Sequence, residues 1–566
     1  MCQPHFVTYK TQQRVQQVKP VNIGWIYLVL ADISGPNSLS RHACHGYNGR
    51  IVFTGSVMMN QNLYSVLASN FPKDDQAPCM MLPDGRVWTY GDVERASGRM
   101  ANLIVALGLK PGDRLAAQVE KTPEALVLYL AALRAGMVFL PLNPAYQRHE
   151  LEYFLSDATP GLFVCRPQMR ALADELAAKA DVPHVLELDD DGCGSLIAAA
   201  TPQANDFLTE SRETADLAAI LYTSGTTGRS KGAMLTHGNL AHNAKTLHSY
   251  WHFQPGDVLL HMLPIFHVHG LFVACHCVLL NGSSMFFEPK FDAARAIKLL
   301  PEVTVFMGVP TYYVRLLLDP TFGFDTCRNI RLFISGSAPL LKETFNEIKL
   351  RSGHTILERY GMTEGGMFTS NPYDGERRGG TVGFPLPGTE LRIVGAGGTA
   401  VKPGGVGHIQ VKGDNVFVGY WRMLEKTKEE FAADGYFKTG DMGTWDADGY
   451  VVISGRSKDL VITGGLNVYP KEIEELIDAM PGVVESAVIG LPHPDFGEAV
   501  SAVVVRQKNP AGAALTEASI INAIKGQLAN FKVPKWVYLV DQLPRNAMGK
   551  VQKNILRQQY SPMRNT

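Results

Sequence analysis

Net charge and long hydrophobic runs are both nearly absent from this sequence of 566 residues. Lys and Arg total 53 and Asp and Glu total 54, which gives a formal net charge of −1. A chain without excess positive charge lacks the electrostatic attraction that nucleic acids and acidic membranes require. The longest apolar runs, Ala125 to Leu133 and Gly270 to Cys275, are shorter than the roughly 18 residues of a membrane-spanning helix. We therefore expect neither a nucleic-acid partner nor an integral membrane protein.

Cysteine is scarce as well. The eight cysteines are scattered, form no Cys-x-x-Cys pair, and none follows Cys327. This spacing does not indicate a disulfide framework, and it favours a reducing compartment. We therefore expect a cytoplasmic protein.

Acidic residues are almost missing from the N-terminal region. Asp32 is the only one between Met1 and Lys73, and the single apolar patch there runs from Ile23 to Ala31. This composition is typical of poorly ordered sequence, and also of an organellar transit segment. We expect a disordered extension over 1–57. A transit segment, which would place the protein in the mitochondrial matrix, is the alternative.

The rest of the chain has the composition of a protein with a large core and the pattern of an α/β fold. Hydrophobic residues make up 46% and charged residues 19%, against about 25% charged residues in typical soluble domains. We expect a helix from Thr89 to Leu107 and a strand from Arg114 to Val119. A second helix, capped by Thr122 and begun by Pro123, precedes a strand from Met137 to Leu140. Strand, helix and strand in this order are typical of a parallel sheet.

The pattern changes twice after this region. Between 382 and 455 helical periodicity gives way to short β-type runs separated by glycine, including Val416 to Trp421, which predicts a β-rich subdomain. A compact α+β pattern follows from 460 to 566. We therefore predict an α/β body of stacked sheets over 58–455, a hinge at 456–459 and a small mobile C-terminal domain.

A loop rich in glycine and hydroxyl residues follows the apolar run Leu217 to Tyr222. Backbone amides next to glycine and side-chain hydroxyls donate hydrogen bonds to phosphate oxygens, and Lys231 would neutralise their charge. The spacing differs from a Walker loop, because Gly232 rather than a magnesium-binding hydroxyl follows the lysine. The loop predicts a polyphosphate site formed by Thr223, Ser224, Gly225, Thr226, Thr227, Gly228 and Lys231.

Five segments, in this order, resemble the signature motifs of the acyl-adenylate-forming superfamily, which includes acyl-CoA synthetases, peptide-synthetase adenylation domains and luciferases. They are Leu221 to Gly232, Glu358 to Glu364, Tyr436 to Asp441, Gly455 to Asp459 and Pro544 to Lys550. The resemblance extends over roughly Met59 to Tyr560 and implies a two-step ligase. ATP and an acid would give an acyl-adenylate and diphosphate, and CoA would then displace AMP.

The resemblance also assigns the nucleotide-binding residues. Tyr360 would stack on adenine, and the Asp441 carboxylate would accept both ribose hydroxyls. Glu358 and Arg456 are the remaining expected nucleotide contacts. Each of these residue types suits its expected partner. The structural alternatives are ordinary core packing for Tyr360 and a helix or turn cap for Asp441.

The catalytic groups follow in the same way. Because an anionic carboxylate attacks an α-phosphate that is already negative, the site must neutralise charge and hold the reactants in line. Glu364 is the expected ligand of Mg²⁺, Thr363 the donor to the α-phosphate, and Lys550 the cation at the reacting groups.

The same family resemblance implies that the C-terminal domain rotates between the two steps. Lys458 occupies the hinge position, and Gly464 and Gly465 would line the tunnel for the pantetheine arm of CoA. Closure of this kind moves the catalytic lysine away after the adenylate has formed.

The acid is indicated by Arg315, the lone cation in an apolar and aromatic helix start. Its guanidinium either faces solvent or enters the acyl pocket and pairs with a second carboxylate, which would reject monocarboxylic acids. Residues 308–315, 332–339, 370–375 and 480–490 are very similar to bacterial malonyl-CoA synthetases, which favours malonate. His269 and Ser337 are the other expected acyl-pocket residues.

Several alternatives remain open. The pair Gly365 and Gly366 replaces larger side chains of the malonate enzymes, and extra room there would admit methylmalonate. The substrate would alternatively be another small or medium-chain acid, or the acceptor a carrier phosphopantetheine in place of CoA. A further alternative is a non-catalytic sensor with the same fold. His267, His269, Cys275 and Cys277 have the residue types of a zinc site, but the family uses this segment as a wall of the acyl pocket.

Overall fold

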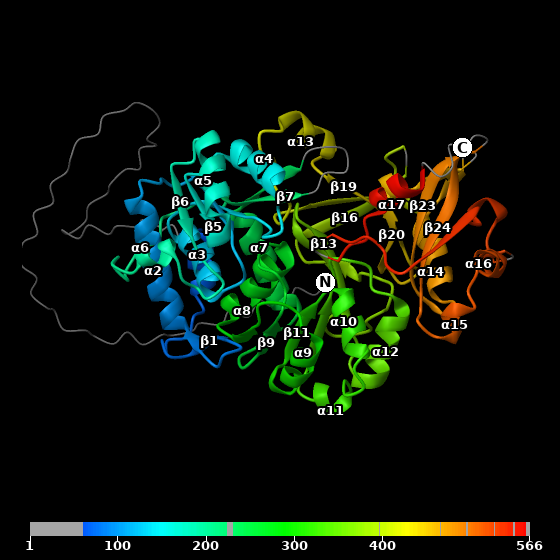
Figure 1. The fold of residues 1–566 in the computed structure, drawn as a ribbon, viewed down its shortest axis with the longest axis horizontal. Helices are drawn as coiled ribbons and strands as arrows, with labels where there is room; N and C mark the ends of the chain where they lie inside the picture. The colour runs from blue at the N-terminus through cyan, green and yellow to red at the C-terminus, as the bar shows by residue number, and fades with distance from the viewer. Residues whose placement is uncertain are drawn as a thin grey trace, which may run out of the picture. The chain divides into compact units, whose positions relative to one another are not determined.

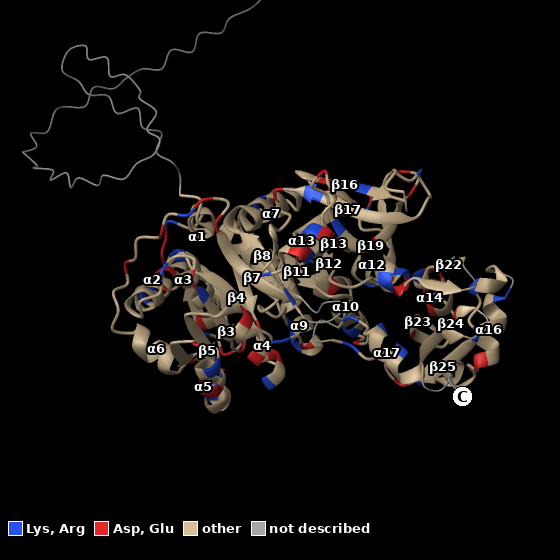
Figure 2. Cartoon of the chain, turned by 90° about the horizontal axis from the view of Figure 1, so that it is seen from above, with Lys and Arg blue, Asp and Glu red and all other residues tan. Residues whose placement is uncertain are grey.

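The computed structural model describes residues 60–223, 230–395, 397–463, 466–493, 496–525, 527–546 and 549–561 (Figure 1). These belong to one unit that begins at Met59, so the expected extension over 1–57 lies outside the described residues. None of the helices in these ranges combines the length and the apolar character that a membrane crossing requires. Figure 2 shows Lys and Arg interspersed with Asp and Glu over the described elements, in keeping with the near-zero net charge.

A seven-stranded sheet is built mainly from the first part of the body. Its strands, in order across the sheet, are β18 (Gly419–Tyr420), β8 (Lys231–Thr236), β7 (Leu217–Thr223), β4 (Val138–Pro141), β3 (Arg114–Gln118), β5 (Leu162–Cys165) and β6 (His184–Glu187). Strands β3 to β7 pair with one another in parallel, whereas β8 is antiparallel to β7. The short apolar runs of the parallel strands are typical of strands covered on both faces. The helices of this half are α1 (Leu63–Ala68), α2 (Tyr90–Ala106), α3 (Pro123–Arg134), α4 (Arg148–Ala158), α5 (Arg170–Lys179) and α6 (Ser195–Ala200).

The predicted strand, helix, strand unit is confirmed. Thr89 caps α2, and its side chain accepts a hydrogen bond from the Asp92 amide. Thr122 caps α3 in the same way through the Ala125 amide, with Pro123 in the first turn. Every residue of α3 is buried, which explains its continuous apolar sequence.

A nine-stranded sheet carries Glu358 and Tyr360 of the predicted nucleotide site. Its order is β15 (Phe384–Pro385), β14 (Gly366–Ser370), β13 (Leu357–Met362), β12 (Leu332–Ser335), β11 (Val305–Gly308), β9 (Val258–His261), β10 (Ser284–Phe287), β1 (Pro78–Met81) and β2 (Val87–Thr89). The central strands are parallel, and β13 to β15 are antiparallel. Its helices are α7 (His237–Tyr250), the π-helix His269–Cys275, α8 (His276–Asn281), α9 (Ala293–Leu299), α10 (Pro310–Leu317), α11 (Phe324–Cys327) and α12 (Lys342–Ser352).

The predicted β-rich subdomain is a four-stranded antiparallel sheet. It contains β16 (Thr389–Val394), β17 (Gly407–Gly413), β19 (Phe437–Trp445) and β20 (Val451–Arg456). The expected strand Val416 to Trp421 is wrong in extent, because only Gly419–Tyr420 is extended, and β18 pairs with β8 of the other sheet. A short helix that the sequence did not indicate, α13 (Leu424–Glu430), follows it.

The C-terminal domain is a five-stranded sheet with helices, as the α+β pattern predicts. The strands are β21 (Val461–Thr463), β22 (Leu466–Val468), β23 (Val483–His493), β24 (Gly497–Arg506) and β25 (Trp536–Val540). The helices are α14 (Pro470–Asp478), α15 (Pro510–Ala513), α16 (Glu517–Ile524) and α17 (Lys553–Tyr560). Of the predicted hinge residues 456–459, Arg456 ends β20 and Ser457–Asp459 form a single 3₁₀ turn.

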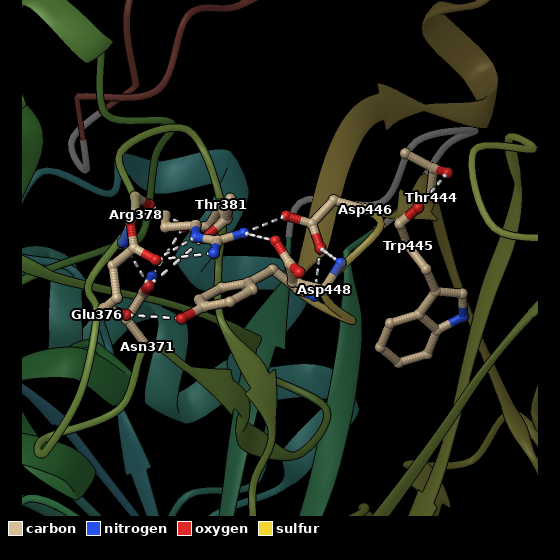
Figure 3. Close-up of polar contacts among 9 residues, drawn as sticks. Asn371, Glu376, Arg378, Thr381, Thr444, Trp445, Asp446 and Asp448 are labelled. Carbon is tan, nitrogen blue, oxygen red and sulfur yellow. Dashed lines mark hydrogen bonds and ion pairs between the residues drawn. The ribbon is translucent and has the colours of Figure 1, made fainter.

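A cluster of polar contacts fastens the β19–β20 hairpin to the segment after β14 (Figure 3). The Arg378 guanidinium contacts Asp446 Oδ2 at 3.2 Å and Asp448 Oδ2 at 2.6 Å, and it lies over the Tyr450 ring. Asn371 Oδ1 accepts a hydrogen bond from the Arg378 amide at 3.0 Å. The hairpin that carries Asp441 is therefore held in one position against the nine-stranded sheet.

Candidate active site

Lys231 lies at the first residue of β8, directly after the predicted phosphate loop. Its ammonium group is 3.2 Å from Glu430 Oε1 of α13 and lies over the Tyr420 ring. Thr223, at the end of β7, pairs with Lys231 across the hairpin. The hairpin thus brings the loop's two described residues together, whereas Ser224, Gly225, Thr226, Thr227 and Gly228 lie outside the described residues.

Glu364 is a buried carboxylate in the turn between β13 and β14, next to Thr363. Its Oε1 atom accepts a hydrogen bond of 2.9 Å from the Tyr420 hydroxyl. Burial raises the pKa of Glu364, and the hydrogen bond from Tyr420 opposes that rise. Since Lys231 lies over the same Tyr420 ring, the predicted phosphate-binding lysine and the predicted metal ligand share one neighbour.

Tyr360 and Asp441 meet across two sheets. The Tyr360 hydroxyl donates a hydrogen bond of 2.6 Å to Asp441 Oδ2, and Arg456 Nε lies 2.9 Å from Asp441 Oδ1. Asp441 and Arg456 are also opposite each other in the β19–β20 pairing. Three residues that were predicted to bind the nucleotide are therefore in one contact group.

Lys550 lies close to this group. Burial, with a smaller contribution from Arg456, lowers the pKa of Lys550 to about 8, while the carboxylates of Asp441 and Glu364 oppose that shift. Asn546 Oδ1 accepts a hydrogen bond from the Lys550 amide at 2.9 Å and fixes the loop. The structure therefore brings the predicted catalytic lysine within electrostatic range of the predicted nucleotide and metal residues.

The structure describes the predicted hinge residue but not the predicted tunnel residues of the C-terminal domain. Lys458 is exposed in the 3₁₀ turn, and its neighbour Asp459 forms an ion pair of 2.9 Å with Arg557 of α17. Gly464 and Gly465, the expected tunnel residues, lie outside the described residues.

The predicted acyl-pocket residues His269 and Ser337 are also together. His269 Nδ1 lies 3.3 Å from Ser337 Oγ, and His269 Nε2 is buried without a partner among the described residues. Ser337 has a φ of +71°, a strained conformation for a residue with a side chain. Backbone strain of this kind is often found at binding sites.

Arg315 is exposed, and not buried in an acyl pocket as one of its two predicted environments required. The residue is exposed on α10 and lines a cavity of about 300 Å³ together with Arg545 and Asn546 of the C-terminal loop. The remaining lining residues are Pro264, Val309, Thr311, Tyr312 and Gly549. Its guanidinium is therefore at the edge of a cavity beside the Lys550 loop.

A buried cation that the sequence did not indicate as a site residue, Arg359, lies near the predicted acyl-pocket residue His269. Its exposed fraction is 3%, and its guanidinium packs against the backbone of Gly336. The signal was present, since Arg359 is a charged residue in the middle of a strand pattern that also contains Glu358 and Tyr360. Only the folded chain shows that it is buried.

Glu358 bonds to the main chain rather than to the other predicted nucleotide-binding residues. Its Oε1 atom accepts a hydrogen bond of 3.3 Å from the Leu340 amide, and burial raises its pKa to about 7. In this arrangement Glu358 supports the segment that follows Ser337. Its expected contact with the nucleotide stays a prediction.

The glycine pair after Glu364 does not open the acyl pocket. A Cβ atom at Gly365 would lie 2.4 Å from the Phe368 ring, and one at Gly366 would lie 2.4 Å from Asn243 Oδ1. Gly366 also has a φ of +63°, which favours glycine. Packing and backbone conformation explain the pair, so it gives no argument for a branched acid.

The comparisons with known proteins agree with this site. The AMP-binding enzyme model matches residues 67–421, and the AMP-binding enzyme C-terminal domain model matches residues 472–550. The chain is 34% identical to a malonate–CoA ligase of Arabidopsis thaliana, with 84% of this chain and 85% of the relative covered. It is 36% identical to the mitochondrial malonate–CoA ligase ACSF3 of Mus musculus, with 84% and 87% covered.

A solved structure extends the likeness to three dimensions. The ATP-bound crystal structure of MatB from Rhodopseudomonas palustris is 56% identical and has a TM-score of 0.87, with 89% of this chain and 100% of that chain covered. The predicted α/β body with a small C-terminal domain and the predicted superfamily are thereby confirmed. This chain belongs to the AMP-binding enzyme family.

Proposed function

We propose that this protein is an AMP-forming malonate–CoA ligase. Malonate and ATP would give malonyl-adenylate and diphosphate, and CoA would then displace AMP to give malonyl-CoA. The observation that carries the first step is the convergence of Lys550, Glu364 and Asp441. The relatives named as malonate–CoA ligases support the choice of acid.

In the adenylation step the chain supplies positive charge at fixed positions. Lys231 binds the outer phosphates, Thr363 donates to the α-phosphate, and Lys550 neutralises the charge that builds up between the carboxylate and that phosphate. Tyr360 and Asp441 fix the adenosine, so that the α-phosphate lies in line with the acid. Glu358 and Arg456 complete the nucleotide contacts.

Glu364 suits a magnesium ion. It is a single buried carboxylate with one oxygen bonded to Tyr420, and the described residues contain no group of three or more His, Cys, Asp or Glu around a common point. Such a site fits Mg²⁺, which keeps most of its waters and binds through one or two carboxylates and the substrate phosphates. Bound there, the ion would neutralise phosphate charge.

For the second step we propose a body over 58–455 and a mobile domain over 460–566 that rotates about Lys458. Rotation removes Lys550 from the α-phosphate and leaves Gly464 and Gly465 beside the pantetheine arm. The 3₁₀ turn at Ser457–Asp459, with its exposed lysine, supports a hinge there.

At the acid end we propose that Arg315, His269 and Ser337 form the polar part of the pocket. The cavity that Arg315 lines lies beside the Lys550 loop, where the acid must meet ATP. A second carboxylate would find a cation there, whereas a plain fatty acid would not.

A diphosphate-release screen with malonate, methylmalonate, succinate, acetate and hexanoate tests the proposal. We expect malonate to give the highest kcat/KM, and detection of malonyl-CoA to follow when CoA is added. Higher activity with hexanoate or acetate would contradict a dicarboxylate ligase. Adenylate formation without acyl-CoA would instead support transfer to a carrier phosphopantetheine.

We also propose the cytoplasm as the compartment. The scattered cysteines support it, and the acid-poor N-terminal region supports the mitochondrial alternative. Cell fractionation with sequencing of the mature N-terminus separates the two.

A further inference from the structure

Lys231, which the proposed function places at the outer phosphates, forms an ion pair with a carboxylate of this chain. Its ammonium group lies 3.2 Å from Glu430 Oε1 and 4.2 Å from the centre of the Tyr420 ring. Both side chains of the ion pair are mostly buried, with exposed fractions of 16% and 23%. Water and salt therefore screen this pair less than they screen a pair on the surface. The cation assigned to the phosphates thus has an anionic partner within the chain itself.

The helix that carries Glu430 gives no reason of its own for a carboxylate at this position. Glu430 is the last residue of α13, where the helix dipole favours cations over anions. None of the seven residues of α13 is buried, so a packed helix face does not hold Glu430 in place. The carboxylate is stabilised by Lys231 and by Lys426, whose ammonium group also lies 3.2 Å from Glu430 Oε1.

The chain on both sides of Glu430 is fixed to the neighbouring strands. Thr427 Oγ1, one turn earlier, accepts a hydrogen bond of 2.9 Å from the Tyr420 amide. Phe431, the next residue, forms a β-bridge with the first residue of β19. Tyr420 belongs to β18, which pairs with β8, the strand that begins at Lys231. The sheet therefore brings together a lysine and a carboxylate that are 199 residues apart in the chain.

Glu364, the other carboxylate of this region, has different neighbours. Its Oε1 atom accepts a hydrogen bond of 2.9 Å from the Tyr420 hydroxyl, and the proposed function assigns it to Mg²⁺. Lys231 contacts the ring of the same tyrosine but forms its ion pair with Glu430. A carboxylate that holds a metal ion attracts phosphate, whereas a carboxylate that pairs with the phosphate-binding lysine opposes it. The two acids therefore act on the phosphates in opposite directions.

We propose that Glu430 competes with the phosphates for Lys231 and thereby promotes the release of diphosphate after adenylation. This inference rests on the proposed function, in which Lys231 binds the outer phosphates. ATP displaces Glu430 from the ammonium group or shares the group with it, and both weaken the binding of ATP. When diphosphate leaves, Glu430 pairs with Lys231 again, so the cation does not lose its partner. Glu430 acts through Lys231 and is a positioning residue rather than a catalytic one.

A purely orienting role for Glu430 predicts the opposite result. If Glu430 only directed Lys231 toward the phosphates, its removal would weaken the binding of both ATP and diphosphate. Competition predicts that its removal strengthens the binding of both. The sign of the change therefore separates the two roles, and a general disturbance of the fold would alter the KM for malonate as well.

The test is the inhibition of malonyl-CoA formation by added diphosphate, measured on the full chain of the wild-type enzyme and of Glu430→Gln. Glutamine has nearly the same shape as glutamate and no charge. We expect the inhibition constant for diphosphate and the KM for ATP to fall about fivefold in this variant, because Lys231 no longer leaves a charged partner. The KM for malonate is expected to change less than about twofold, since the substitution affects only the phosphate end of the site.

Two further substitutions complete the test. Glu429→Gln is the matched control, because Glu429 lies on the same helix and pairs with Lys426 at 2.9 Å instead of with Lys231. It is expected to keep the wild-type constants. Lys231→Met is expected to raise the inhibition constant for diphosphate by about 10-fold or more, because it removes a charged donor. In the Lys231→Met background, Glu430→Gln is expected to change this constant less than about twofold, since the two anions no longer share a cation.

The inference is overturned if Glu430→Gln raises the inhibition constant for diphosphate or leaves it unchanged, or if Glu429→Gln lowers it equally. It is also overturned if Glu430→Gln keeps its full effect in the Lys231→Met background, because Glu430 would then act without the lysine. Failure of the proposed function looks different, since Lys231→Met would then leave the KM for ATP unchanged or the wild-type enzyme would form no malonyl-CoA.

Discussion

Asp441 Oδ2 accepts a hydrogen bond of 2.6 Å from the Tyr360 hydroxyl, and Asp441 Oδ1 forms an ion pair of 2.9 Å with Arg456 Nε. One carboxylate thus connects the β-rich subdomain, the nine-stranded sheet and the first residue of the predicted hinge. We propose that the same oxygens bind the ribose. The nucleotide would then depend on Asp441 more than on either of its partners.

Asp441→Ala is expected to raise the KM for ATP by about 10-fold to 100-fold, since it removes a charged acceptor and leaves Arg456 without its partner. Tyr360→Phe retains the ring and is expected to raise the KM less than about 10-fold. Steady-state kinetics at saturating malonate measure both. Equal losses in the two variants would argue that the tyrosine hydroxyl, and not the carboxylate, determines nucleotide binding.

Lys550→Ala is expected to reduce adenylate formation by at least about 100-fold, because it removes the preorganised cation at the α-phosphate. Thioester formation from supplied malonyl-adenylate and CoA is expected to be nearly unchanged, since the proposed rotation removes Lys550 before that step. Exchange of labelled diphosphate and direct detection of malonyl-CoA measure the two half-reactions separately. Equal loss of both would refute the role of Lys550.

The pH dependence of adenylation follows from the same lysine. Its pKa of about 8 means that the free enzyme carries the cation below about pH 8 and loses it above. The kcat/KM for ATP in the exchange reaction is therefore expected to fall about tenfold per pH unit above that value. Lys550→Arg is the control, because arginine stays charged. Its residual activity should not decrease up to pH 10, and a wild-type decline shared by this variant would assign the titration to another group.

Glu364→Gln is expected to raise the Mg²⁺ concentration needed for half-maximal activity by about 10-fold or more, because the amide has no charge. Glutamine still offers an acceptor to the Tyr420 hydroxyl, so the local packing is conserved. A magnesium titration at saturating ATP and malonate, with Tyr420→Phe as a comparison, gives the result. An unchanged magnesium requirement would remove Glu364 from the proposed site.

Lys121 gives a prediction about stability. It is fully enclosed in the body, where its ammonium group contacts His261 Nδ1 and the carbonyls of His261 and Glu288, and burial lowers its pKa from 10.5 to about 7. Between these two values the unfolded chain binds more protons than the folded one, so the free energy of unfolding rises with pH. The slope is about 1.4 kcal/mol per pH unit.

Urea unfolding at pH 7 and pH 9 measures this slope. Lys121→Met is expected to be less stable overall, because two buried carbonyls lose their donor. Its stability is expected to lack the rise that Lys121 contributes between these pH values. An identical pH dependence in both proteins would show that the lysine is not the titrating group.

Local sequence signals predicted the elements well where one short segment determines the structure. Thr122 and Pro123 start α3 through contacts within a single turn, so the sequence is sufficient. The extent of β18 depends instead on β8, which lies far away in the chain, and the expected strand was too long for that reason.

The same distinction between local sequence signals and contacts of distant segments holds for the site. Lys550, Glu364 and Asp441 were predicted from motifs, and the structure brings them together. Arg359 was missed although it lies within a recognised motif, because its burial results from Gly336 on another strand connection. Arg315 was considered as a buried cation, yet the last turn of α10 leaves it exposed. Burial of a charge is a property of packed segments that no single segment reveals.

Strand β13 directs Tyr360 to Asp441 and the adjacent Arg359 to Gly336. Successive side chains of a strand point to opposite faces, so two neighbouring residues serve two separate sets of contacts. A substitution at position 359 would therefore alter the packing against Gly336 and leave the contact between Tyr360 and Asp441 in place. A one-residue slip of the same strand would exchange the two faces and break both sets of contacts at once.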